Sequence, residues 1–123
     1  MRATLEVIAF QVAKILEVMR TDSGMSIDVL RVDGGAVVNR FLVQFQAGIL
    51  GIPVDVPKIN ETTALGTAFL AAIGVGDVEG TDTLRDVWRL ECRYEPRFSR
   101  DEREMRMSDW RAVERSREWA QDE

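Results

Sequence analysis

The segment Leu30-Arg31-Val32-Asp33-Gly34-Gly35-Ala36-Val37-Val38-Asn39 decides the fold of this chain. Its opening residues are typical of a short buried strand, and the apolar residues after the glycine pair favour a helix. Two adjacent glycines at a strand-to-helix junction allow a ligand, or another stretch of backbone, to approach closely. The helix that follows presents its free N–H groups and the positive end of its dipole at the same place. We therefore predict a ligand site with Gly34, Gly35 and Asn39 as binding residues, and place Asn39 one turn into the helix.

The glycine pair alone does not identify the ligand. The chain lacks the G-x-G-x-x-G fingerprint of dinucleotide-binding folds and the phosphate loop with its lysine. Nucleotide contact and a plain tight turn are therefore both compatible with the residues. Asp33, at the carboxyl end of the strand, can act as a base, order the loop or hold an arginine. Of these three roles we favour the ordering of the loop.

Helical and strand patterns alternate on both sides of this turn, which indicates an α/β fold with a thin sheet. Residues 2–20 carry one helical apolar stripe, and residues 27–32 form the strand. After the turn we expect a helix that ends at Gly51. The prolines at the ends of residues 53–57 suit a strand at the edge of a sheet. The remaining elements are expected as follows: a helix at 61–73, a loop at 74–80, a short helix at 81–89, a strand at 90–94 and a helix at 99–119.

Two of these helices give more specific expectations. The helix at residues 61–73 is rich in small side chains, and Gly66 in its interior costs about 1 kcal/mol relative to alanine. We favour close packing of another element against Gly66 over a position beside a ligand cleft or hinge. In the last helix, Ser99 and Glu102 match a capping box. Three apolar residues of that helix are expected to face the core: Met107, Trp110 and Val113.

Composition excludes several classes of function. With 16 basic and 21 acidic residues the formal net charge is −5, so nucleic acid is not expected as a partner. The chain has no histidine and one cysteine, which excludes a histidine triad, a histidine metal site and a four-ligand zinc site. We assign no catalytic and no metal-binding residue. No apolar run approaches about 18 residues and no signal-peptide core is present, so we expect a cytoplasmic protein without a membrane partner.

The glycine segment resembles, nearly residue for residue, the adenosine motif of glycerol kinases in the FGGY carbohydrate kinase family. The resemblance continues through residues 41–46, 49–51, 54–57 and 61–68, and it is looser beyond Gly76. Residues 2–6 also resemble the family helix that precedes this region. The related pentulose kinases usually carry a different glycine-rich sequence here, so the resemblance favours glycerol as the substrate.

This resemblance implies a partial ribonuclease-H-like domain of the actin-like ATPase superfamily, with helices packed on a small sheet. It also implies the transfer of the γ-phosphoryl group of ATP to glycerol, with Mg²⁺, to give glycerol 3-phosphate. At the matching positions, Gly35 and Asn39 line the adenine-nucleotide (ATP/ADP) site, and Gly34 lies in the same turn. Arg40 differs from the second asparagine that is commonest in the family after Asn39.

The resemblance covers only the last part of such a kinase. We interpret residues 1–123 as the C-terminal segment of the second FGGY domain: residues 1–80 form the core with the adenosine motif, and residues 81–123 form the C-terminal helices. The phosphate loop, the glycerol-binding residues, the catalytic aspartate and the Mg²⁺ ligands are expected outside it, so we predict no kinase activity for the chain alone. A bare apolar sheet edge predicts self-association or pairing with the rest of the kinase. The alternatives are a non-catalytic stand-alone domain and a fragment of a kinase for another polyol or sugar.

Overall fold

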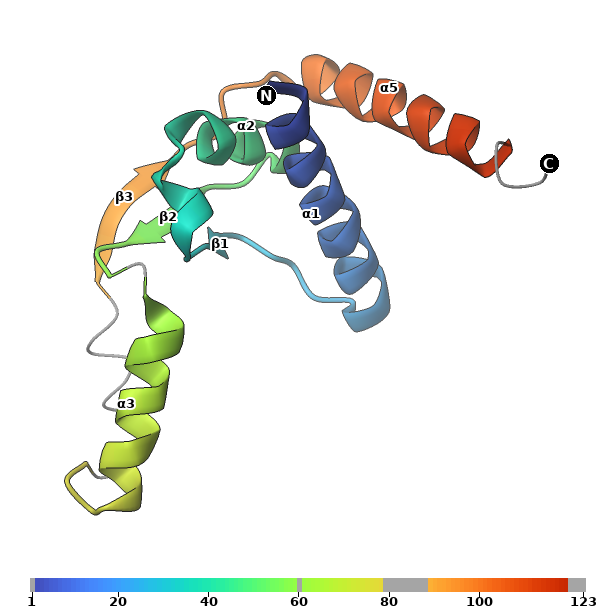
Figure 1. Cartoon of the computed structure of the whole chain (residues 1–123). Helices are drawn as coiled ribbons and strands as arrows, with labels where there is room; N and C mark the ends of the chain where they lie inside the picture. Colours follow the sequence, from blue (N-terminus) through green and yellow to red (C-terminus); the bar gives the residue numbers. More distant parts are fainter. Residues whose placement is uncertain (1, 60, 79–88, 120–123) are drawn as a thin grey trace.

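The computed structural model describes residues 2–59, 61–78 and 89–119 (Figure 1). These residues form an α/β arrangement, as predicted, and the short helix expected at 81–89 lies outside them except for its last residue. The elements follow in this order: α1 (Arg2–Ser23), β1 (Leu30–Arg31), the 3-10 helix η1 (Gly35–Val38), α2 (Arg40–Leu50), β2 (Val54–Pro57), α3 (Thr62–Gly74), β3 (Leu90–Tyr94) and α5 (Arg100–Trp119).

The sheet has the strand order β1-β2-β3, with β1 parallel to β2 and β2 antiparallel to β3. The prediction of an edge strand at residues 53–57 is therefore wrong, because β2 is the central strand and all of its residues are buried. Prolines are tolerated at its two ends for separate reasons. Pro53 precedes the strand and contributes only its carbonyl, which accepts from the N–H of Leu30 at 3.0 Å. Pro57 lies opposite Leu90 at a shift in the register.

Helix α2 lies between two apolar clusters, and most of its residues are therefore buried. One side packs against α1, and the other packs against the sheet and η1. The first cluster contains Ala9, Ala13, Leu42, Phe45 and Ile49. The second contains Val37, Val43, Ala47, Val54 and Val56. Burial on both sides makes α2 the support that fixes the glycine turn relative to the sheet.

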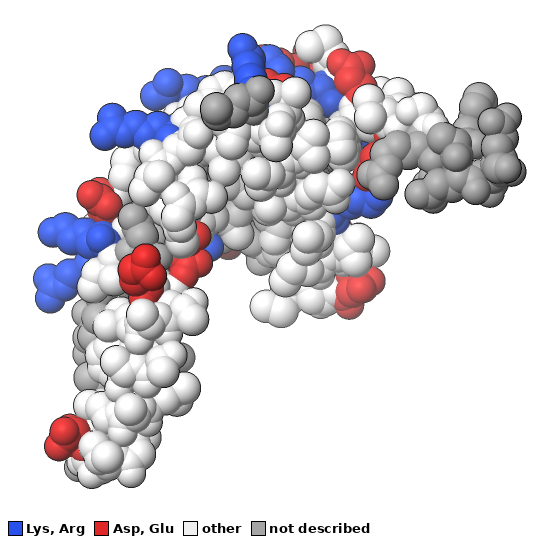
Figure 2. All heavy atoms as spheres, viewed as in Figure 1, with Lys and Arg blue, Asp and Glu red and all other residues white. Residues whose placement is uncertain are grey.

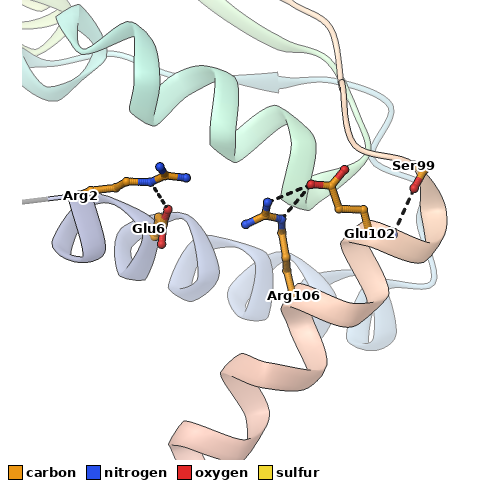
Figure 3. A network of polar contacts seen from close by, with 5 residues as sticks. All are labelled: Arg2, Glu6, Ser99, Glu102 and Arg106. Carbon is orange, nitrogen blue, oxygen red and sulfur yellow. Dashed lines mark hydrogen bonds and ion pairs between the residues drawn. The ribbon is translucent and has the colours of Figure 1, made fainter.

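Helix α5 begins at the predicted cap. The Ser99 hydroxyl accepts from the backbone N–H of Glu102 at 3.1 Å. The Glu102 carboxylate turns to Arg106, whose Nη2 donates to it at 2.9 Å (Figure 3). Only the serine half of the predicted capping box is therefore formed. Arg106 is held in place on its other side by the ring of Phe98, which lies 4.6 Å from its guanidinium carbon.

The inward residues of α5 are only partly as predicted. Trp110 is buried, and its ring stacks on Phe10 with the centroids 5.2 Å apart. Met107 packs against the first cluster. Val113 is 51% exposed, so its predicted inward position is wrong. Next to Val113, Glu114 forms an ion pair with Lys14 of α1 at 2.9 Å. The two helices therefore meet at this point through charged side chains, and not through Val113.

Helix α1 keeps its predicted register but buries only part of its stripe. It extends to Ser23, and Gly24 then closes it with a φ of +66°. Ala9 and Leu16 are buried, whereas Ile8, Ile15 and Met19 are 42%, 58% and 53% exposed. The described part of the chain therefore covers one side of the predicted apolar stripe and leaves the other side in solvent.

Helix α3 extends away from the other helices (Figure 1). None of its residues is buried. A Cβ atom built at Gly66 meets no other atom within 4 Å. The predicted packing of another element against Gly66 is therefore absent among the described residues.

Gly51 gives a direct test of how α2 ends. Its φ is +66°, and the Arg103 guanidinium occupies the space that a Cβ atom would need. We expect Gly51→Ala to lower the free energy of unfolding by about 2 kcal/mol, because alanine costs about 1–2 kcal/mol in this backbone region and Arg103 must also move. Chemical denaturation measures the loss. Gly24→Ala is the matched control, since Gly24 has the same φ but open space around it; equal losses in both variants would contradict a role for Arg103.

Candidate functional site

The glycine turn, Gly34-Gly35, lies at the carboxyl end of β1 and directly before η1. Gly34 has a φ of +88° and a ψ of 177°, a conformation that side chains rarely adopt. Cβ atoms built at Gly34 and Gly35 meet no atom within 4 Å. The backbone of this glycine pair therefore borders open space, as the sequence predicted.

Asn39 caps α2 and does not lie inside it. Its Oδ1 accepts from the backbone N–H of Leu42 at 3.2 Å, and the helix begins at Arg40. The prediction that Asn39 lies one turn into the helix is wrong, because η1 takes up the residues after the glycines and asparagine is among the best N-cap residues. The cap uses the side-chain oxygen and does not involve the Nδ2 group, which carries two donor hydrogens.

A groove of about 560 Å³ lies beside this cap. Its lining is mixed, with the apolar side chains of three valines beside the opposite charges of Arg40 and Glu91. Burial is the main reason that the pKa of Tyr94 lies above its ordinary value. The lining residues come from η1, the start of α2, β2 and β3: Val37, Val38, Arg40, Val56, Glu91, Cys92 and Tyr94. Sequence reasoning missed the part contributed by β3, because those residues are distant along the chain.

Asp55 is a second residue that sequence reasoning missed. Its side chain is 4% exposed and accepts two hydrogen bonds from Arg93, at 2.6 and 2.8 Å. The hydrogen bond from Arg93 is the main reason that the pKa of Asp55 lies below its usual value. The Asp55 carbonyl accepts from the N–H of Val32 at 3.0 Å. From the central strand β2, Asp55 thus contacts β3 through its carboxylate and the residue after β1 through its carbonyl. The second contact anchors the backbone that enters the glycine turn.

Other kinds of site are absent from the part of the chain that the structure describes. Within residues 2–59, 61–78 and 89–119, no three His, Cys, Asp or Glu side chains come together as metal ligands. In the same ranges, no helix combines the length and apolar character needed to cross a bilayer.

The fold and the glycine turn define an α/β segment whose candidate site lies at the carboxyl end of a parallel strand, where ligands bind in open α/β sheets. Residues 1–75 match the model of the C-terminal domain of the FGGY family of carbohydrate kinases. The chain belongs to this family, which confirms the resemblance seen in the sequence.

Similar proteins are much longer than this chain. Glycerol kinase 2 of Thermotoga maritima is 51% identical over 119 residues, which are 96% of this chain and 24% of that protein. A glycerol kinase of Oleidesulfovibrio alaskensis is 49% identical over 122 residues, with 98% and 24% covered. The chain therefore spans about a quarter of the length of the curated relatives that it matches.

Solved structures confirm the fold. The crystal structure of Plasmodium falciparum glycerol kinase with ADP superposes with a TM-score of 0.76 at 34% identity, covering 93% of this chain and 23% of that one. The ligand-bound xylulose kinase of Lactobacillus acidophilus gives a TM-score of 0.75 at 17% identity, which is a likeness of fold alone. The arrangement of elements in Figure 1 is therefore similar to that of the matching part of a solved glycerol kinase.

Proposed function

We propose that the chain is the C-terminal, nucleotide-binding portion of a glycerol kinase, an enzyme that transfers the γ-phosphoryl group of ATP to glycerol and gives glycerol 3-phosphate. One observation carries the proposal: 51% identity to a glycerol kinase across 96% of the chain. The solved glycerol kinase that resembles this chain contains ADP. The open glycine turn supports an adenine nucleotide as the ligand here as well.

The residues of the turn suit an adenosine. At Gly34 and Gly35 the absence of side chains lets a ring or a ribose lie against the backbone. Asn39 would donate from its Nδ2 group to a polar edge of the base, because its Oδ1 already accepts from the N–H of Leu42. When bound, the nucleotide supplies the phosphoryl group, and Mg²⁺ neutralises its phosphates through ligands outside this chain.

The same proposal assigns the domains. Residues 1–123 form the C-terminal segment of the second FGGY domain, with residues 1–80 as the core that carries the adenosine motif. The match of the family model to residues 1–75 supports this core. Residues 81–123 contribute the C-terminal part, in which α5 supports α1 and α2 through Trp110 and Arg106.

A chimera tests the proposed function. Replacing the matched 24% of Thermotoga maritima glycerol kinase 2 by this chain is expected to give an enzyme that phosphorylates glycerol within about tenfold of the parent rate. The chain alone is expected to be inactive, because phosphoryl transfer also needs a phosphate cradle, metal-binding carboxylates and a base. A coupled ADP-release assay measures both. An inactive but folded chimera, or glycerol phosphorylation by the purified chain, would contradict the proposal.

A further inference from the structure

A cleft of about 300 Å³ lies between α1 and α5, at the end of α2. Three arginines line it, although they come from two distant helices. Arg20 lies in the last turn of α1, and Arg103 and Arg111 lie about two turns apart on α5. Four apolar side chains lie beside them: Ala13, Leu16, Leu50 and Met107. A volume of this size accommodates a small molecule.

The three arginines of the cleft differ from other arginines of α5 in having no acidic partner. None of the three forms an ion pair within residues 2–59, 61–78 and 89–119. By contrast, Arg100 pairs with Glu104 and Arg106 pairs with Glu102, both at 2.9 Å. Acidic atoms lie among the basic ones around α1, α2 and the start of α5, whereas α3 is almost uncharged (Figure 2). Carboxylates are therefore present nearby, but they leave the charges of the cleft unpaired.

The guanidinium groups of the cleft are held by the backbone. Arg20 donates from Nη2 to the carbonyl of Ile27 at 3.0 Å, and Arg111 donates from Nε to the carbonyl one turn before it at 3.3 Å. Arg103 occupies the space that a side chain at Gly51 would need. A backbone carbonyl fixes a guanidinium without neutralising its charge, and each guanidinium carries five N–H donors. Most of these donors therefore remain for a ligand.

Two glutamates also line the cleft, so the balance of charge decides which ligand it attracts. Glu104 accepts from Nε of Arg100 at 2.9 Å, and Arg100 does not belong to the lining. Glu17 forms no ion pair in the described part of the chain. Three positive charges thus face two negative ones, of which one is already paired. The cleft is electropositive in a chain with a net charge of −5, and such a cleft concentrates anions.

We propose that this cleft binds a small phosphomonoester. Guanidinium groups form bidentate, charge-assisted hydrogen bonds with phosphate oxygens, and several of them together neutralise a dianion. The apolar side chains of the lining offer a surface to the organic part of the ester. The glycine turn precedes the start of α2, whereas the cleft lies at its end, and a helix of 11 residues is about 16 Å long. The two sites therefore lie at opposite ends of α2, and this proposal does not rest on the proposed function.

Titration of the purified chain with phenyl phosphate, at constant ionic strength, tests the proposal. We expect saturable binding with a Kd of about 1 mM or tighter, and a higher Tm at saturation because the ligand bridges α1 and α5. Arg20→Gln and Arg111→Gln are each expected to raise the Kd about tenfold, the effect of one lost charge-assisted hydrogen bond. Arg115→Gln is the matched control, since Arg115 is exposed on the same helix and does not line the cleft. It changes the net charge equally and is expected to leave the Kd unchanged.

Glu17→Gln gives a test that partial unfolding cannot imitate. It removes a negative charge from the lining, so the Kd for phenyl phosphate is expected to fall about threefold. An unchanged or higher Kd in this variant would overturn the proposal. So would the absence of saturable binding up to about 10 mM, or an equal rise of the Kd in Arg111→Gln and Arg115→Gln. In the chimeric kinase, displacement of phenyl phosphate by saturating ADP would also overturn it, because the two sites are expected to be independent.

Discussion

Asp55→Ala is expected to lower the free energy of unfolding by about 2–3 kcal/mol, the largest loss for any single side chain considered. The substitution removes the bidentate partner of Arg93 in the central strand and leaves the guanidinium without its acceptor. Breaking a fully buried pair costs about 3–5 kcal/mol, but Arg93 is 47% exposed and regains water. Urea denaturation measures the loss. Asp28→Ala, an exposed aspartate just before β1, is the control and is expected to change stability by less than about 0.5 kcal/mol.

The same residue predicts how stability depends on pH. Because Arg93 lowers the pKa of Asp55 in the folded state, the unfolded chain takes up this proton first as the pH falls. The contribution of Asp55 is therefore fully present above the ordinary carboxyl pKa of about 3.9, and it is lost below that value towards the folded pKa. Asp55→Asn is expected to flatten this part of the stability profile. A profile identical to that of the unsubstituted chain would contradict the role of the ion pair.

The local features of the sequence were predictable because each one is decided within a few residues. The end of α2 at Gly51, the open glycine pair and the Ser99 cap are of this kind. Asn39 was predicted as a binding residue one turn into the helix, and its capping role was not predicted, because the intervening 3-10 helix leaves no signature in the apolar pattern. The ligand site at Gly34, Gly35 and Asn39 stays a prediction, whereas the hydrogen bond of Asn39 required the structure.

The predictions that were wrong concern features that depend on residues distant in the chain. Two prolines suggested an edge strand, but β3 supplies the second neighbour of β2 and makes it central. The same pairing brings Arg93 to Asp55 and Tyr94 to the groove. The packing predicted against Gly66 also depends on a distant element, and among the described residues a Cβ atom at Gly66 meets no other atom within 4 Å. An apolar pattern predicts which face is to be buried, and only the complete assembly determines its partner.

Substitutions of Asn39 are expected to separate its role as a helix cap from its proposed role in nucleotide binding. In the chimeric kinase, Asn39→Ala loses the bond to Leu42 and about 1 kcal/mol of stability. Asn39→Ser retains a capping oxygen but lacks the Nδ2 donor. It is therefore expected to keep the stability of the chimera while the Kd for ADP rises about three- to tenfold, the effect of one lost hydrogen bond.

Calorimetric titration with ADP and thermal unfolding of the same samples measure the two effects separately. Ser99→Ala is the matched control, because it removes the equivalent cap of α5, whose oxygen accepts from Glu102 at 3.1 Å. This variant is expected to lose a similar amount of stability with no change in the Kd for ADP. If Asn39→Ser binds ADP as tightly as the unsubstituted chimera, the asparagine acts only as the cap of α2, and the nucleotide contact must come from the glycine backbone.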